Sequence, residues 1–188
     1  MMKRSAVLVL ALLAVAQPWF AGVAAQATTA VQCEQRRNLC IFDFDHTLKK
    51  GCCYHCCGVL PAEAVAAVRE CIENNFEIAI ASANRNYNFV RDFLGANFPS
   101  ELTSKLYTEA VQTGQSYKTS SLTAVLRYHG MQSNPGCAVF FDDLWSNKKY
   151  ADDVGIPFEK VDPDYGVSVT NVKDGIDKVR KGCACGVG

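Results

Sequence analysis

The sequence has no apolar run long enough to cross a membrane and no excess of charge of either sign. Its longest apolar stretch, from Ala6 to Ala16, is about half of the roughly 20 residues that a membrane-spanning helix needs. Because 19 basic residues balance 19 acidic ones and no basic stripe is present, there is no electrostatic reason to expect nucleic acid as a partner. Repeats, linkers and low-complexity tracts are also absent, which favours one domain with a core of its own.

The first 25 residues are arranged like a secretory signal peptide. Lys3 and Arg4 precede the apolar run, and small residues follow it near Ala25 and Ala27. We therefore expect cleavage there, and export of residues 26–188 to the cell exterior or to the endomembrane lumen, without a membrane anchor. An uncleaved signal anchor is the alternative, and the shortness of the apolar run disfavours it.

All ten cysteines follow this leader. An even number of cysteines in an exported chain predicts disulfide bonds, although the sequence alone does not reveal their connectivity. A cluster of four cysteines with His55, within a cysteine-rich insertion at 49–60, could instead hold zinc, because thiolates and imidazole suit that ion. The clustered cysteines are Cys52, Cys53, Cys56 and Cys57, and the others are Cys33, Cys40, Cys71, Cys137, Cys183 and Cys185.

Short apolar runs typical of buried strands alternate with amphipathic stretches typical of helices. This alternation predicts an α/β fold, in which a mainly parallel central sheet is covered by helices on both faces and ligands bind at the carboxyl ends of the strands. The segment 99–117 is less regular, with a short helix and a short strand expected around Leu106. The expected strands are 39–44, 76–81, 138–141 and 158–161, and the expected helices are 61–74, 86–97, 120–128, 144–153 and 170–180.

The first expected strand ends in the sequence IFDFDHTL, which contains Asp43, Asp45 and Thr47. Phosphoryl transfer needs a nucleophile in line with the leaving group, a proton donor and a cation, and the two aspartates can supply the first two. A helix cap or a solvated turn is the plain alternative. An EF-hand loop is excluded, because its required glycine and glutamate are replaced by Leu48 and Tyr54.

Three further pieces fit the same chemistry. Asp142 and Asp143 follow another apolar strand, and parallel pairing would bring one of them to Asp43 around a hard divalent cation. Ser82 follows the second expected strand, and Lys118 precedes a helix; a hydroxyl and an ammonium can both bind phosphoryl oxygens. Taken singly, the serine is more typical of a helix cap and the lysine of a solvated surface.

Taken together, DxDxT, a serine, a lysine and DD in this order resemble the four motifs of the haloacid dehalogenase superfamily. The resemblance spans Leu39 to about Gly166, and ASANRN at 81–86 and FFDDLWSN at 140–147 look most like its small magnesium-dependent phosphatases. Such proteins act on phosphotyrosine-type and sugar phosphate substrates. The resemblance implies a three-layer Rossmann-like sandwich without a large cap domain, because only the cysteine-rich segment 49–60 stands in the cap's place.

The resemblance also implies a role for each motif residue. Asp43 would attack phosphorus to form an aspartyl phosphate, and Asp45 would protonate the leaving oxygen and later activate water. Mg²⁺ would bind Asp43, the Asp45 carbonyl and one of Asp142 and Asp143; we favour Asp143, with Asp142 orienting Lys118. The phosphate-binding candidates are Ser82, Lys118, Thr47, Ala83 and Asn84, with Arg85 and Asn147 on adjacent loops and His46 at a turn position where the family often has glycine.

The sequence thus predicts a magnesium-dependent phosphomonoester hydrolase that acts on a phosphorylated small molecule or a phosphoprotein. A phosphotransferase or nucleotidase on the same fold is one alternative. The other is a secreted, disulfide-rich binding protein that has lost turnover, and the presence of both Asp43 and Asp45 argues against it.

Overall fold

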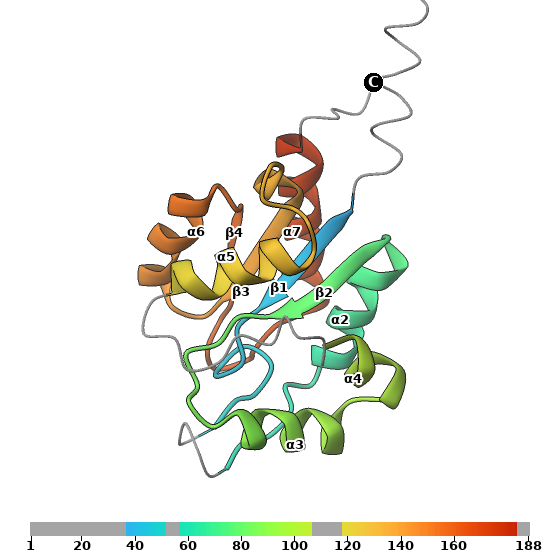
Figure 1. Cartoon of the computed structure of the whole chain (residues 1–188). Coiled ribbons are helices and arrows are strands. Elements are labelled where there is room, and N and C mark those ends of the chain that lie inside the picture. Colours follow the sequence, from blue (N-terminus) through green and yellow to red (C-terminus); the bar gives the residue numbers. More distant parts are fainter. Residues whose placement is uncertain (1–36, 52–56, 107–117, 184–188) are drawn as a thin grey trace, which may run out of the picture. The chain divides into compact units, whose positions relative to one another are not determined.

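A sheet of four parallel strands lies at the centre of the protein, in the order β2-β1-β3-β4 (Figure 1). The computed structural model describes residues 37–51, 57–106 and 118–183, which belong to one compact unit. The chain runs from β1 outward to β2 and then returns past β1 to β3, so the connections diverge between β1 and β3. The strands are β1 (Asn38–Phe42), β2 (Phe76–Ile80), β3 (Ala138–Asp142) and β4 (Phe158–Lys160).

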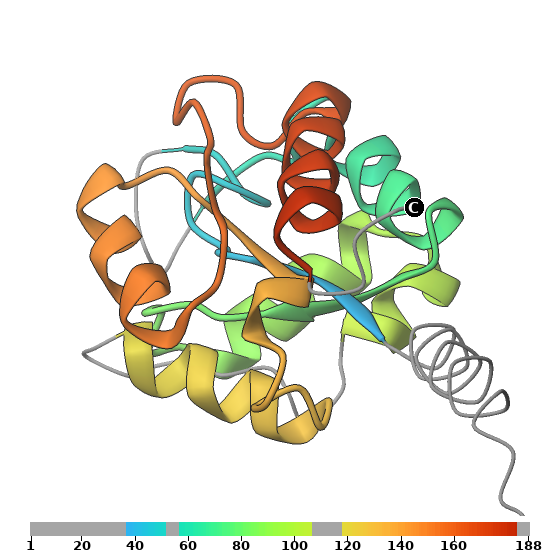
Figure 2. The same ribbon diagram turned by 90° about the horizontal axis from the view of Figure 1, so that it is seen from above.

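Helices cover both faces of the sheet (Figure 2). On one face α2 and α7 pack beside each other against the strands, and on the other face α5 and α6 do the same. The side chains of β1 alternate accordingly: Cys40 and Phe42 join the core beneath α2 and α7, while Leu39 and Ile41 join the core beneath α5 and α6. The helices are α2 (Ala64–Glu73), α3 (Tyr87–Asn97), α4 (Ser100–Leu106), α5 (Lys118–Tyr128), α6 (Lys148–Val154) and α7 (Val169–Gly182), with short 3₁₀ turns η1 (Pro135–Cys137) and η2 (Trp145–Asn147).

The predicted three-layer α/β architecture is confirmed, and within the described residues there is no additional cap domain. Most element boundaries differ from the sequence-based expectation by one to three residues, and two helices differ in a way that affects the site. The helix expected at 120–128 begins at Lys118, and the helix expected at 144–153 is divided into η2 and α6. Leu106 ends α4, so a short helix does lie where a short helix and a short strand were expected around Leu106; residues 107–117 are outside the described part of the chain.

The predicted leader, 1–25, also lies outside the described residues. Among the helices that are described, none is long and apolar enough to cross a membrane.

Within the described residues, two disulfide bonds join helices to the sheet or to the turn before it. Cys40–Cys71 links β1 to α2 across 31 residues, and Cys137–Cys183 links the start of β3 to the end of α7 across 46 residues. Closing loops of this length in the unfolded chain stabilises the folded state by about 4 kcal/mol per bond in the chain-entropy model. Both bonds agree with the disulfides predicted from the even cysteine count, whereas most of the cluster, Cys52 to Cys56, lies outside the described residues.

We predict that replacing Cys40 and Cys71 together with alanine lowers the free energy of unfolding by about 2–4 kcal/mol. Both sulfurs are buried, so alanine removes the covalent link without introducing a polar group into the core. Urea denaturation followed by circular dichroism measures the change. Peptide mapping of unreduced protein gives the control, because a Cys40–Cys71 peptide must be present before substitution; equal midpoints for both proteins would contradict the prediction.

Candidate active site

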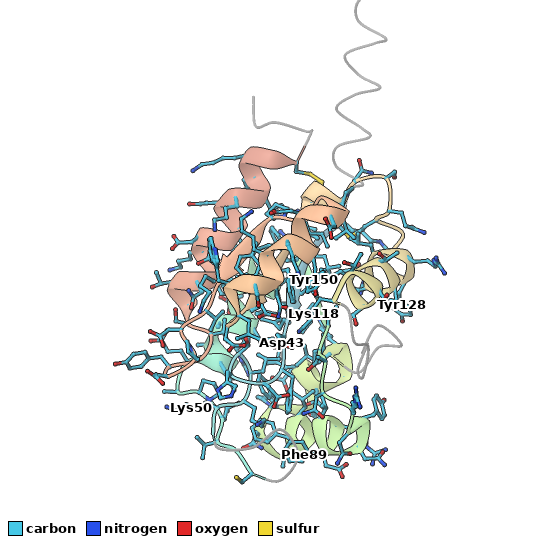
Figure 3. All side chains as sticks on the ribbon, turned by 90° about the vertical axis from the view of Figure 1, so that its left-hand side faces the viewer. Asp43, Lys50, Phe89, Lys118, Tyr128 and Tyr150 are labelled. Carbon is cyan, nitrogen blue, oxygen red and sulfur yellow. A yellow bond between two sulfur atoms is a disulfide. The ribbon has the colours of Figure 1, made fainter. Side chains whose placement is uncertain are left out.

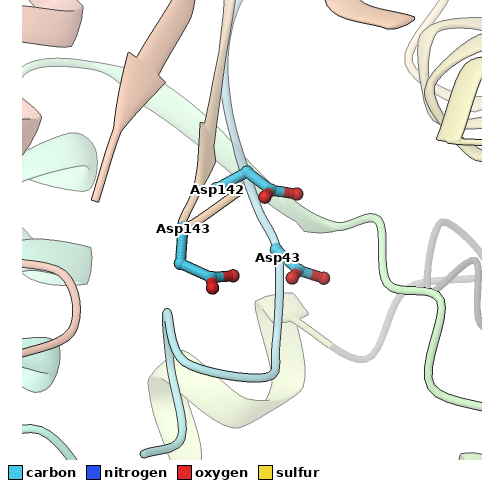
Figure 4. Close-up of side chains that lie close together, drawn as sticks. All are labelled: Asp43, Asp142 and Asp143. Carbon is cyan, nitrogen blue, oxygen red and sulfur yellow. The ribbon is translucent and has the colours of Figure 1, made fainter. Parts of the chain in front are cut away.

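Three carboxylates meet where β1 and β3 end. The pairing of Phe42 with Phe141 brings the ends of the two strands level, and the Asp43 amide continues the ladder by donating to the Phe141 carbonyl at 2.9 Å. One carboxylate oxygen each of Asp43, Asp142 and Asp143 lies within 4.8 Å of the others (Figure 4). This edge is also where the chain connections diverge, the usual position of ligand sites in open parallel sheets.

Lys118 at the start of α5 supplies a cation to this group. Its Nζ lies 2.5 Å from Asp43 Oδ1 and 3.2 Å from Asp142 Oδ2, and it also donates to the Ala81 carbonyl at 2.9 Å. Strand alternation explains the convergence, because Asp43 and Asp142 continue the residues of β1 and β3 that face α5. Lys118 and Asp43 lie beside each other in Figure 3.

The protonation of these groups depends on their burial together. Burial by itself would lower the pKa of Lys118, but the carboxylates of Asp43 and Asp142 outweigh it and raise that pKa above its usual value. Burial, with the neighbouring Asp43 charge, raises the pKa of Asp142 to about 6 and also raises the pKa of Asp143. Lys118 therefore remains an ammonium, and bringing the carboxylates together costs free energy unless further positive charge is present.

The two adjacent aspartates have different environments. Asp142 is fully buried, and its oxygens accept the Leu144 amide at 2.7 Å and the Asn147 side-chain amide at 2.9 and 3.0 Å. Asp143 points toward the other side of β3 and lines the cavity. Asp142 thus contacts Lys118 and the loop after β3, while Asp143 faces the cavity; the metal-ligand role of Asp143 and the orienting role of Asp142 stay predictions.

Asp45 is held beside this group by Asn84. Asn84 Nδ2 donates to Asp45 Oδ2 at 2.9 Å, and the Asn84 backbone amide donates to Ser82 Oγ at 3.1 Å. Asn84 Oδ1 in turn accepts the Asn86 amide at 2.9 Å, and Asn86 caps α3. The loop after β2 thus fixes the orientation of the second aspartate of the DxD pair.

These residues line one cavity of about 430 Å³. Of the predicted phosphate-binding residues, Ser82, Lys118, Ala83 and Asn84 line it, whereas Thr47 is fully buried and does not. The full lining is Asp43, Asp45, His46, Ser82, Ala83, Asn84, Arg85, Lys118, Asp143, Leu144, Asn147 and Tyr150.

His46 lies at a turn and also contributes to the wall of the cavity. Its φ of 59° lies in the left-handed region that favours glycine, as expected for a turn position, and its side chain also lines the cavity.

Lys49 and Tyr150 were not predicted from the sequence as site residues. Lys49 is completely buried with its Nζ 2.9 Å from Asp45 Oδ1, and Tyr150 lines the cavity from α6. Lysine is usually exposed, so the sequence offers no sign that Lys49 turns inward. Tyr150 could have been found from its position, because it lies one helical turn beyond Asn147.

The donor set fits a hard divalent cation. Carboxylate oxygens are the ligands that Mg²⁺ prefers, and the three carboxylates converge on one point with net negative charge after Lys118 is counted. Among the described residues, Asp43, Asp142 and Asp143 are those that could hold such an ion.

No protein-family model matches the sequence, and no curated protein sequence matches it either. Solved structures do match the fold. A haloacid dehalogenase-like family hydrolase from Streptococcus pneumoniae aligns with a TM-score of 0.53 at 10% identity, covering 73% of this chain and 90% of that one. A haloacid dehalogenase-superfamily hydrolase from Ehrlichia chaffeensis aligns with a TM-score of 0.50 at 17% identity, covering 66% and 61%.

The N-terminal part of a Bacteroides fragilis protein, which contains a phosphatase domain complexed with Mg, aligns with a TM-score of 0.57 at 14% identity. The alignment covers 80% of this chain and 43% of that one. At these identities the similarity concerns the backbone, and it agrees with the resemblance that the four sequence motifs carry. The described residues therefore adopt the haloacid dehalogenase fold.

Proposed function

We propose that the protein is a magnesium-dependent phosphomonoester hydrolase that forms an aspartyl phosphate on Asp43. One observation carries the proposal: Asp43, Lys118 and Asp143 meet at the carboxyl edge of the sheet and line one cavity, with the buried Asp142 behind Lys118. Asp43 lies at the centre of this arrangement, because both the ammonium and the other carboxylates are placed around it.

The chemistry follows from the positions of these groups. Asp43 attacks phosphorus while Asp45, oriented by Asn84, gives its proton to the leaving oxygen as the phosphorus–oxygen bond breaks. Water then attacks the aspartyl phosphate, Asp45 takes its proton, and Asp43 is released as a carboxylate. Lys118 and Ser82 bind phosphoryl oxygens throughout, and a bound Mg²⁺ supplies charge neutralisation for the phosphoryl group.

The rim of the cavity suggests the kind of substrate. Leu144, which is 52% exposed, and Tyr150 are an apolar and an aromatic part of the lining, and Arg85 adds a guanidinium. An apolar and aromatic side favours an aryl group next to the phosphate, so we propose a phosphotyrosine-type substrate, on a small molecule or a phosphoprotein. A sugar phosphate is the second candidate.

The disulfides bear on where the protein acts. Cys40–Cys71 and Cys137–Cys183 are stable in an oxidising compartment, which supports the proposed export to the cell exterior or the endomembrane lumen. A phosphotransferase or nucleotidase would use the same residues, and a binding protein without turnover would not need the Asp45–Asn84 contact.

Asp43→Asn is expected to reduce the hydrolysis of an aryl phosphate by at least about a thousandfold, because it removes the nucleophile while keeping the side chain's size. Release of the phenol in the presence of magnesium measures the activity. Acid-quenched wild-type protein should carry a phosphoryl group on Asp43 by mass spectrometry. Asp153→Asn, at an exposed aspartate of α6 outside the cavity, is the matched control and should keep full activity; Asp43→Asn with comparable turnover would refute the assignment.

The two aspartates of β3 should respond differently to substitution. Asp143→Asn should raise the magnesium concentration needed for half-maximal rate by at least about tenfold, because it removes a ligand. Asp142→Asn should change that concentration less and lower the maximal rate, because Lys118 loses a charge partner. Rates measured across a magnesium titration give the concentration for half-maximal rate of each variant. A larger increase for Asp142→Asn than for Asp143→Asn would make Asp142 the ligand.

Magnesium binding is expected to weaken by about tenfold from about pH 7.5 to about pH 5, because protons compete for carboxylates whose pKa values are raised. The pKa of Asp142 is about 6 in the folded protein, against 3.8 in the unfolded chain. Its contribution to the stability of the folded, metal-free protein is therefore present at low pH and is lost as the pH rises through about 6. Magnesium should therefore raise the melting temperature more at the higher pH. Calorimetric titration at constant ionic strength measures the affinity, and equal affinity at both pH values would contradict this reasoning.

A further inference from the structure

Lys49 is a completely buried lysine whose ammonium lies against the carboxylate of Asp45. The Nζ–Oδ1 distance is 2.9 Å, and the Asp45 side chain is itself 8% exposed. The rings of Phe44 and Phe89 lie beside the same ammonium, with their centroids 5.9 and 5.8 Å from Nζ. Cation–π contact and a counter-ion together make the burial of this charge possible.

The backbone around Lys49 is built to hold the side chain in this position. The loop folds back so that the His46 amide donates to the Lys49 carbonyl at 2.5 Å, and Lys50 pairs with Val59 by two backbone hydrogen bonds of 3.0 and 2.8 Å. Gly58 lies directly against the stem of Lys49: a Cβ at Gly58 would be 2.5 Å from Lys49 Cγ and 2.6 Å from Cδ. The end of the cysteine-rich segment therefore forms the wall that covers Lys49.

The Asp45 carboxylate is consequently held from two sides. Asn84 Nδ2 donates to Oδ2 at 2.9 Å, and Lys49 faces Oδ1. Oδ1 is buried and makes no hydrogen bond with a described residue, so the contact with Lys49 is an attraction between charges rather than an aligned hydrogen bond. Asn84 thus orients the Asp45 carboxylate through a hydrogen bond, and Lys49 places a positive charge beside it.

We propose that Lys49 is a positioning residue that supports proton transfer by Asp45 to the leaving group; this rests on the proposed function. When Asp45 gives up its proton, negative charge develops on a carboxylate that is shielded from water. A fixed ammonium at 2.9 Å stabilises that charge without having to reorganise, and it keeps the carboxylate from rotating away from the substrate. The group tuned by Lys49 is therefore the general acid, not the nucleophile.

Two aromatic phosphate esters whose leaving groups differ in basicity test the proposal in the full-length protein. Dinitrophenyl phosphate releases a stable phenolate that needs no proton, whereas phenylethyl phosphate releases an alkoxide that does. Lys49→Met should lower kcat/KM for phenylethyl phosphate by about a hundredfold and for dinitrophenyl phosphate by less than about threefold. Because kcat/KM reports the steps up to departure of the leaving group, it isolates this proton transfer.

Lys50→Met is the matched control, since Lys50 is the adjacent lysine. Within the described part of the chain, its Nζ donates to the Asp164 carbonyl at 3.5 Å. This substitution should leave both values unchanged. Equal losses on both substrates for Lys49→Met would overturn the proposal and leave Lys49 a structural residue. If the unaltered protein hydrolyses neither substrate, the proposed function is wrong, and the inference is overturned with it.

A second variant and a stability measurement keep the test independent of how well Lys49→Met folds. Gly58→Ala retains both charges but displaces the lysine stem, so it should show the same selective loss on phenylethyl phosphate to a smaller degree. In urea denaturation, Asp45→Asn should lower the unfolding midpoint by leaving Lys49 without its counter-ion, and adding Lys49→Met should raise it again. Additive effects of the two substitutions would show that the charges are not coupled and would overturn the proposal.

Discussion

The crowding of negative charge at one edge of the sheet is the constraint on which the candidate site depends. Four carboxylates follow β1 and β3 within a few residues of each other, and all are at least nine-tenths buried. When all four are ionised, as after Asp45 has given up its proton, the two buried ammoniums of Lys118 and Lys49 balance half of this charge. A divalent cation would balance the remainder, and the arriving phosphoryl group would then meet a site without excess negative charge. The same constraint explains why both lysines are buried.

The crowding in turn follows from strand register. Because Phe42 pairs with Phe141, the first residue beyond β1 lies level with the last residue of β3. A register shifted by one residue would turn Asp142 toward α2 and α7 and away from Lys118. Stacking of the Phe42 and Phe141 rings, with centroids 4.9 Å apart, and the packing of Gly175 of α7 against Phe141 favour the observed register. Apolar packing one residue before the site therefore determines which carboxylates meet.

Much of the fold and the motif residues of the site could be predicted from the sequence, because their signals are local. The alternation of strand-like and helix-like segments predicts the α/β architecture. The positions of Asp43 and Asp142 at the ends of parallel strands predict that their side chains lie close together. What could not be predicted depends on side-chain direction in a loop. Lys49 and Lys50 are identical in type and adjacent, yet only Lys49 is fully buried, because Gly58 and the Phe44 and Phe89 rings make room for it.

The two described disulfides and the candidate site lie in different parts of the fold. Cys137–Cys183 joins the end of α7 to the amino edge of the sheet, just before β3, and Cys40–Cys71 joins α2 to the middle of β1. The carboxyl edge has no described disulfide and holds the site in loops linked by polar contacts, such as those of Asn84 and Asn147. Covalent stabilisation elsewhere in the fold offsets the free-energy cost of buried like charges at the carboxyl edge, and it does so without restricting the loops that must receive a substrate.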